Sequence, residues 1–227
     1  MVFRDPGVGE FGLTNALMPL GETWLEVVSP EAPDAPARRW LARRGGDAGY
    51  MAIFQCAPEA LDDEVARAEG AGARSVWRGE REGGRTVHFH PRELGAIASL
   101  DAMPAWNDWV WARPPGAAVA PASGSGAARA TIAAVELAGP DPAALAGRWA
   151  ALLGLAAPPA GDPAPVLELP RGGALRFRAG PEAALTGLDV AGLDPARFAQ
   201  RARARGVLET DGAARIAGTR IAPSGPA

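Results

Sequence analysis

The alternation of apolar and polar positions between residues 49 and 101 predicts a strand, a helix and three further strands. The apolar run 49–55 is typical of a buried strand. Residues 60–69 have helical spacing and end before Gly70 and Gly72, which favour the end of a helix. The further strands are predicted at 74–77, 85–90 and 96–100, with a hairpin turn within 79–84. This βαβββ order is typical of units that pair into a curved sheet around a cleft.

The same order of strand, helix and further strands occurs twice more after residue 130. A strand at 130–137 precedes a helix that Asp141 caps, that begins at Pro142 and that ends at Gly154. A second copy consists of a strand at 185–190 and a helix from Asp194 to Arg205, which Gly206 ends. Such internal similarity, at a period of roughly 50 residues, indicates a duplicated unit. Short strands complete the pattern at 165–169, 174–178, 215 and 219–222.

The beginning of the chain departs from this pattern. Residues 11–20 and 23–28 have the character of the late strands of such a unit. Residues 1–10 are too few, and too rich in turn residues, to supply a first strand and helix. We therefore expect that the natural chain starts upstream of Met1.

The segment 114–128 divides the sequence. It is uncharged and rich in Pro, Gly and Ser, which is typical of a linker. We predict an N-terminal domain at 1–113 and a diverged second domain at 129–227. The expected fold class is α+β, with tandem βαβββ modules in curved mixed sheets, the first module lacking its first strand and helix.

Composition narrows the classes of function. The net charge of −3 and the absence of a basic run argue against a nucleic-acid partner. No apolar run reaches membrane-spanning length and no signal peptide is recognisable, so we expect a soluble cytoplasmic protein. All basic residues apart from histidine are arginines, which leaves no lysine for a Schiff base or a phosphate-binding P-loop. The single cysteine, Cys56, excludes an intrachain disulfide and is interpreted as a small apolar filler.

Strand alternation predicts three polar side chains in the cleft of the first domain, namely Glu26, Tyr50 and Ser99. Glu26 shares a strand face with Trp24 and Val28. A carboxylate between large apolar residues is costly unless it is paired, bound to a metal or placed at a cleft. The alternative is a strand-end carboxylate that forms an ion pair with an arginine.

On the strand 49–55, Met51 and Ile53 are expected to face the helix, which leaves Tyr50 and Phe54 toward the cleft. We expect the cleft to be lined by Trp24, Glu26, Tyr50, Phe54, His88, His90 and Ser99.

His88 and His90 are two residues apart and therefore lie on the same side of a strand. One interpretation is an acid–base pair or two metal ligands. The other places one ring at the rim of the cleft, while the second ring caps the turn at 90–95. The spacing alone does not decide between them.

Three segments, 12–28, 44–55 and 88–101, resemble the glyoxalase-like branch of the vicinal oxygen chelate superfamily. The resemblance covers 12–111 and extends more weakly over 130–222. It implies paired βαβββ modules. In the active enzymes of the superfamily it also implies a divalent metal, bound by His or Gln on the first strands of the modules and by Glu on the last strands. Glu26 matches one such carboxylate, whereas Tyr50 and Ser99 replace two other ligands. The fourth position falls upstream of Met1, so Glu26 is the single candidate metal ligand in this domain.

Two functions follow from the resemblance. The first is a lyase or isomerase that acts on a small carbonyl or thiol-conjugated substrate, with Glu26, His88 and His90 as catalytic residues. Substrate would then be bound by Trp24, Tyr50, Phe54 and Ser99. The second is a non-catalytic protein that binds or sequesters a small molecule, as bleomycin-resistance relatives do. In both, the partner is a small-molecule ligand, and a homodimer is one way to cover the incomplete first module.

Overall fold

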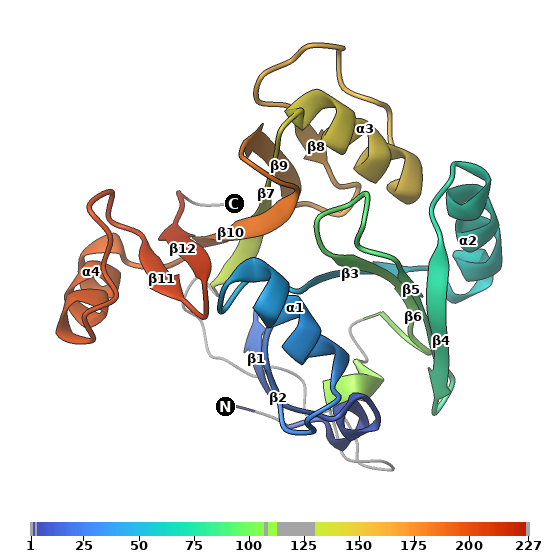
Figure 1. Cartoon of the computed structure of the whole chain (residues 1–227), viewed down its shortest axis with the longest axis horizontal. Helices are drawn as coiled ribbons and strands as arrows, with labels where there is room; N and C mark the ends of the chain where they lie inside the picture. Colours follow the sequence, from blue (N-terminus) through green and yellow to red (C-terminus); the bar gives the residue numbers. More distant parts are fainter. Residues whose placement is uncertain (1, 3, 107–108, 113–129, 226–227) are drawn as a thin grey trace. The chain divides into compact units, whose positions relative to one another are not determined.

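The structure is a computed structural model that describes residues 2, 4–106, 109–112 and 130–225 (Figure 1). The chain divides into two compact units. Unit 1 contains Met1–Ala48, Asn107–Ala133 and Leu188–Ala227, and unit 2 contains Gly49–Trp106 and Ala134–Gly187. The strands of the described residues form three sheets, so the predicted α+β fold with curved mixed sheets is confirmed.

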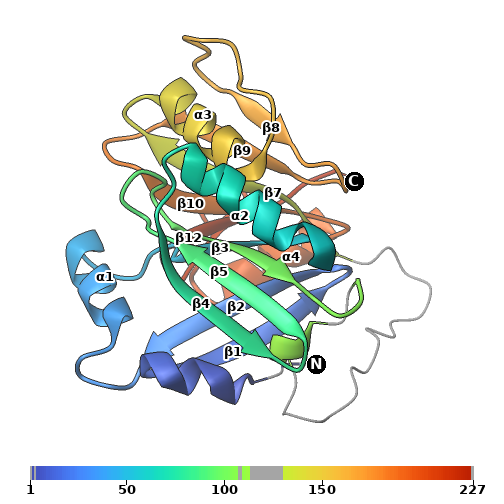
Figure 2. The same ribbon diagram turned by 90° about the vertical axis from the view of Figure 1, so that its right-hand side faces the viewer.

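The first half of unit 2 is a complete βαβββ module. Its elements are β3 (Met51–Cys56), α2 (Leu61–Gly70), β4 (Ser75–Arg81), β5 (Gly84–Phe89) and β6 (Ile97–Ala102), with a 3-10 turn, η2 (Pro58–Ala60), before α2. The strand order is β3-β6-β5-β4, in which β3 is parallel to β6 and the other pairs are antiparallel. The helix α2 covers one face of this sheet (Figure 2). The predicted hairpin joins β4 to β5 through Glu82 and Gly83, which both have positive φ.

The second half of unit 2 has the order strand, helix, strand, strand, which is the βαβββ order with one strand fewer. It contains β7 (Thr131–Gly139), α3 (Pro142–Leu153), β8 (Val166–Glu168) and β9 (Ala174–Ala179). The strand β7 is parallel to β9, and β8 is antiparallel to β9. The predicted helix cap is confirmed, because the Asp141 carboxylate accepts a hydrogen bond of 2.9 Å from the backbone N–H of Ala144.

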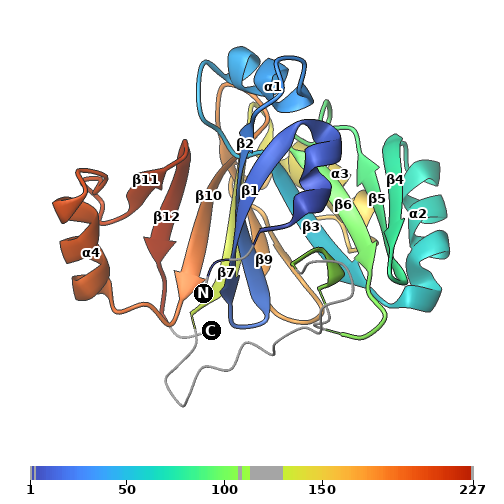
Figure 3. The same ribbon diagram turned by 90° about the horizontal axis from the view of Figure 1, so that it is seen from below.

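The duplication predicted from the two Asp-Pro helices is present in the structure. The second copy contains β10 (Ala184–Ala191), α4 (Pro195–Ala204), β11 (Ala214–Ile216) and β12 (Thr219–Pro223), and Figure 3 shows α4 beside β11 and β12. The six-stranded sheet has the order β11-β12-β10-β7-β9-β8, and the boundary of the units falls within β7 and β10. In each copy the first strand neighbours the last, as β7 neighbours β9 and β10 neighbours β12.

The N-terminal part of unit 1 is a hairpin with a helix. After the 3-10 turn η1 (Pro6–Phe11), β1 (Leu13–Leu20) pairs with β2 (Thr23–Pro30), as predicted, and α1 (Pro36–Arg44) follows. Unit 1 also contains the 3-10 turn η3 (Val110–Ala112). The helix α1 buries Trp40, and the guanidinium of Arg44 lies 4.6 Å from the centre of that ring. Sequence reasoning missed α1, although Pro36 at its start and Gly45 at its end are ordinary helix signals.

The core of unit 2 takes side chains from both of its halves. Leu61 and Phe89 from the first half share one buried cluster with Trp149 and Phe177 from the second. The indole N–H of Trp149 donates a hydrogen bond of 3.0 Å to the carbonyl of Leu94, so the buried ring leaves no unpaired donor. The two modules of unit 2 are therefore one packed body.

Two close approaches join these halves. Arg67 of α2 donates hydrogen bonds to the carbonyls of Ala151 and Leu152 at the end of α3, the latter at 2.8 Å. A cation at this position satisfies carbonyls that the end of a helix leaves unpaired. At Gly95, a Cβ atom would lie 2.5 Å from the backbone of Ala183, so only glycine permits this approach.

The two predicted domains, 1–113 and 129–227, do not coincide with these two units. Each unit takes residues from both sides of the segment 113–129. The predicted linker at 114–128 lies outside the described residues. Within the residues that the structure describes, no helix is long and apolar enough to cross a membrane.

Candidate functional site

A group of polar and aromatic side chains lies on the side of the β3-β6-β5-β4 sheet that is opposite α2. We call it the His88 face, and its members are Trp77, Thr86, His88, Ser99 and Asp101. Strand pairing fixes their places, because Trp77 and Ser99 both lie opposite His88, and Thr86 lies opposite Asp101. The opposite side of the same strands carries the apolar residues that pack under α2.

Three of these side chains form a buried hydrogen-bonded cluster. Ser99 is 0% exposed, Asp101 2% and Thr86 5%. The Thr86 hydroxyl donates to Asp101 Oδ1 at 2.7 Å and lies 2.9 Å from the Ser99 hydroxyl, which also donates to Asp101 Oδ1. Because both hydroxyls point at one carboxylate oxygen, the cluster offsets the cost of burying that carboxylate.

His88 lies beside this cluster and against the ring of Trp77. The centre of its ring is 4.6 Å from the centre of the Trp77 ring, with an angle of 45° between the planes. Burial lowers the pKa of His88 to about 4. This low pKa favours the neutral ring at pH 7, in which one nitrogen is a donor and the other an acceptor.

The predicted orientation of β3 is wrong by one residue. Phe54 lies on the α2 side, where its ring is 5.9 Å from that of Trp149, and Ala52 belongs to the same core. Met51 and Ile53 lie on the side of the His88 face instead, opposite Ile97 and Ser99 of β6. Both sets of side chains are apolar, so alternation alone could not assign the faces.

Tyr50 is the residue before β3, and its carbonyl accepts a hydrogen bond from the backbone N–H of Ile97 at 3.0 Å. His90 follows β5, and its Nδ1 accepts a hydrogen bond of 3.1 Å from the backbone N–H of Arg92. His90 therefore caps the turn, as the second interpretation of the two histidines proposed. Ser99 and His88, by contrast, lie directly opposite one another on the same face.

Glu26 and Trp24 belong to unit 1, where alternation places both on the same face of the hairpin. Asn15 Nδ2 donates a hydrogen bond of 2.6 Å to Glu26 Oε1, and Asn15 Oδ1 accepts one of 2.9 Å from the backbone N–H of Asp5. Burial raises the pKa of Glu26, the Asn15 hydrogen bond lowers it, and the Asp5 charge raises it. Since the net direction is upward, this carboxyl group holds a proton more readily than a free glutamate.

Sequence reasoning missed four residues of these two sites. Thr86 and Asp101 lie two positions from His88 and Ser99 along their strands, so strand alternation could have found them. Trp77 and Asn15 lie on neighbouring strands, and their positions depend on pairing register, which no local signal in the sequence gave.

A sequence model described as a glyoxalase-like domain matches residues 5–153. That range covers more than half of the chain. The chain belongs to the glyoxalase-like domain family. The resemblance predicted over 12–111 is therefore confirmed, and the match extends through α3. The α+β fold is the one that this glyoxalase-like family and the vicinal oxygen chelate superfamily share.

Several solved structures share this fold. A mutant of 4-hydroxymandelate synthase from Streptomyces coelicolor is 17% identical with a TM-score of 0.64, over 91% of this chain and 67% of that one. A hypothetical protein from Staphylococcus aureus is 8% identical with a TM-score of 0.61, over 99% and 88%. The Mn(II)-bound glyoxalase from Novosphingobium aromaticivorans is 12% identical with a TM-score of 0.56, over 95% and 74%. No curated protein matches the sequence.

The donor atoms of the glyoxalase-like chain do not fit the divalent metal that the fold family implies. Within the described ranges, no group of three or more His, Cys, Asp and Glu side chains could hold a metal ion. Glu26, the one predicted ligand, is hydrogen-bonded to Asn15 and belongs to no such group within those ranges. We therefore derive no chemistry through a metal at this site.

Proposed function

We propose that this glyoxalase-like protein binds a small, partly apolar molecule at the His88 face without a metal. The observation that carries the proposal is the position of the His88 ring, which lies 4.6 Å from the Trp77 ring and opposite Ser99 of the buried Asp101 cluster. A neutral imidazole is a hydrogen-bonding group that needs no counter-ion, which suits an uncharged ligand.

The surroundings of His88 indicate the chemistry of the ligand. Ile53, on the same side of the sheet, is 38% exposed and offers apolar contact area. Trp77 offers an aromatic surface, and ligand sites typically combine such surfaces with a few polar groups that fix orientation. A flat or aliphatic molecule that carries a carbonyl or hydroxyl group would match this combination.

Thermal-shift measurements with a panel of small aromatic and aliphatic carbonyl compounds test the proposal. We expect ligands that raise the melting temperature of the wild type and of His90→Ala, but not of His88→Ala. The variant of His90 is the matched control, because it removes an imidazole two residues away that caps a turn. Chelator should leave the shift unchanged, and elemental analysis should find no stoichiometric metal. A stoichiometric metal whose removal abolishes binding would contradict the proposal.

Metal-independent proton transfer by Glu26 is a second candidate, in line with the predicted lyase or isomerase. The observation in its favour is the raised pKa of this carboxyl group, since a general acid or base works best when its pKa is near the working pH. Glu26→Gln keeps an oxygen that can accept the Asn15 hydrogen bond but cannot exchange a proton. We expect this variant to abolish turnover of a small carbonyl substrate and to retain ligand binding; unchanged turnover would exclude the role.

A further inference from the structure

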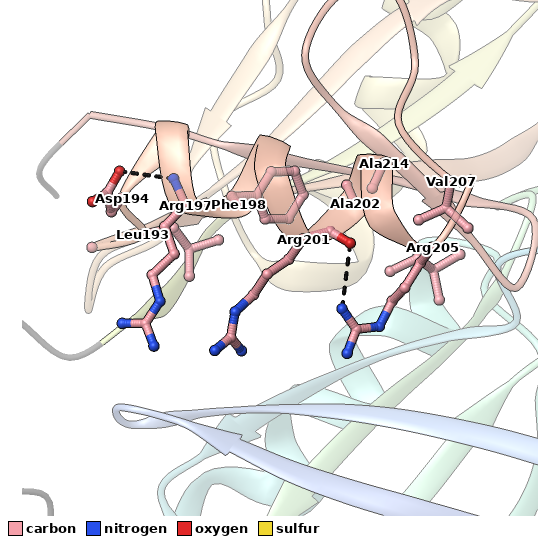
Figure 4. A pocket seen from close by; sticks show the side chains of 11 residues that line it. Leu193, Asp194, Arg197, Phe198, Arg201, Ala202, Arg205, Val207 and Ala214 are labelled. Carbon is pink, nitrogen blue, oxygen red and sulfur yellow. Dashed lines mark hydrogen bonds between the residues drawn. The ribbon is translucent and has the colours of Figure 1, made fainter.

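Three arginines form a row along one side of α4 in unit 1. Arg197, Arg201 and Arg205 are spaced four residues apart, so successive members lie on the same face of the helix with a rise of about 6 Å. All three are exposed, and Figure 4 shows their guanidinium groups projecting from the same side of α4. We call these residues the arginine row.

No carboxylate of the described residues forms an ion pair with the arginine row. The acidic side chains nearby have other partners. Asp194 caps the start of α4, Glu209 pairs with Arg215 at 2.7 Å, and Asp211 pairs with Arg220 at 2.7 Å. The row is therefore a local excess of positive charge on a chain whose net charge is −3.

Helix stability explains only part of the row. Cations in the last turn of a helix are stabilised by its dipole, which accounts for Arg201 and Arg205. Arg197 lies in the first turn, where the dipole disfavours a cation. A function that uses all three guanidinium groups together accounts for the whole pattern.

An apolar surface accompanies the row. The three arginines border an open pocket of about 450 Å³ together with Leu193, Phe198, Val207 and Ile216 (Figure 4). Ile216 is 44% exposed, which is high for a large aliphatic residue. The surface therefore offers cations along one side and apolar contacts beside them.

We propose that this surface docks an acidic amphipathic helix of a partner protein. Carboxylates at every fourth residue of such a helix repeat at the same interval of about 6 Å as the arginines. Its apolar residues would contact Phe198, Val207 and Ile216. The whole row spans about 12 Å, which is more than a single carboxylate can bridge. A nucleic-acid backbone would pair with the arginines but offers nothing apolar for the pocket.

Fluorescence anisotropy with the full chain tests this proposal. The labelled peptide is a designed helix with glutamate at three successive fourth positions and leucine beside them. A second peptide carries glutamine in place of each glutamate. We expect the first peptide to bind in a salt-dependent manner and the glutamine peptide to bind at least about tenfold more weakly.

Variants locate the site. Arg201→Gln and, separately, Arg205→Gln should each weaken binding of the acidic peptide several-fold, and Ile216→Ser should do so without changing the salt dependence. Arg203→Gln is the matched control, because Arg203 is exposed on the same helix but does not line the pocket. Circular dichroism melts confirm that each variant is folded.

Four results would each overturn the proposal. They are no binding of the acidic peptide, equal binding of the glutamine peptide, an equal loss in Arg203→Gln, and tighter binding of an RNA oligonucleotide or of anionic lipid vesicles than of the peptide.

Discussion

At the scale of single residues, burial changes the pKa of three ionisable side chains. It lowers the pKa of His88 to about 4 and raises that of Cys56 to about 11. It also raises the pKa of Glu26. All three shifts favour the uncharged form of the side chain, which is the form that a partly apolar environment tolerates.

His88 should make the protein less stable in mild acid. The unfolded chain binds a proton at His88 near pH 6.5, whereas the folded chain does so only near pH 4. The contribution of His88 to the free energy of unfolding is therefore fully present above about pH 6.5 and is lost as the pH falls toward 4. We expect a loss of about 1–3 kcal/mol, reduced by solvent screening at a half-buried ring.

Denaturant unfolding of wild type and His88→Gln between pH 4 and pH 7 measures this effect. The variant should lose that part of the pH dependence, while His90→Gln should keep it. An unchanged slope in His88→Gln would show that another group carries the titration.

Cys56 should react slowly with alkylating agents. Burial is the largest cause of its raised pKa, with charge from Glu64 next. With a pKa of about 11 rather than the ordinary 9.0, the thiolate fraction at pH 8 falls roughly a hundredfold. Iodoacetamide labelling followed by mass spectrometry is unambiguous, because the chain contains one cysteine. Labelling as fast as that of a free thiol would contradict the burial of this side chain.

Strand alternation predicted the faces of β5 and β6 but failed on β3. His88 and Ser99 stand out as polar positions among apolar neighbours, so their shared side could be assigned from sequence. On β3, Ile53 and Phe54 are both large and apolar, and which of them faces the helix depends on how Trp149 packs. That information lies nearly a hundred residues away in the chain and is not local.

At the scale of elements, helix ends were the most predictable feature. Both α3 and α4 begin at an Asp-Pro pair and end at or just before a glycine. These signals predicted the first and last residues of both helices to within a residue or two. The arrangement of those ends was not predictable. Arg67 lies within the predicted helix 60–69, and nothing local to it predicts that it donates to the final carbonyls of α3.

Gly154→Ala should separate backbone strain from the loss of this contact. Gly154 and Gly206 share a φ of +69°, but a Cβ on Gly154 would lie 2.9 Å from the Arg67 guanidinium, and one on Gly206 would contact nothing within 4 Å. Each substitution should cost about 1 kcal/mol for the left-handed backbone. Gly154→Ala should cost about 1 kcal/mol more, because it displaces a charged donor from its carbonyls.

Urea unfolding of the two alanine variants gives the comparison. Combining each variant with Arg67→Ala should remove the difference between them. If Gly154→Ala and Gly206→Ala lower the free energy of unfolding equally in the wild-type background, Arg67 adapts freely and does not join α2 to α3.

At the scale of the whole molecule, the composition of the units was beyond sequence reasoning. The order of elements predicted the repeats within 49–101 and 130–222, but it could not say which repeats share a core. Unit 2 joins 49–106 to 134–187, so Phe89 and Trp149 lie in one cluster across the predicted domain boundary. The predicted homodimer also depends on surfaces that no local pattern specifies, and it stays a prediction that light scattering can test.

Fragments divided within 113–129 should fold only together. Neither 1–113 nor 129–227 contains all the residues of either unit. We expect each fragment alone to have little fixed tertiary structure by NMR, and an equimolar mixture to recover the dispersed spectrum of the intact chain. A dispersed spectrum from either fragment alone would instead support two independent domains at the boundaries predicted from sequence.

The shared core of unit 2 also has a consequence for synthesis of the protein in the cell. As the chain leaves the ribosome, the sheet of β3 to β6 emerges before the α3 side chains that complete its core. Trp149 follows Trp106 by roughly 40 residues, which is a delay of several seconds at ordinary rates of translation. During that interval the core under α2 lacks the side chains that α3 supplies, and this is the stage at which a chaperone would protect the protein from aggregation.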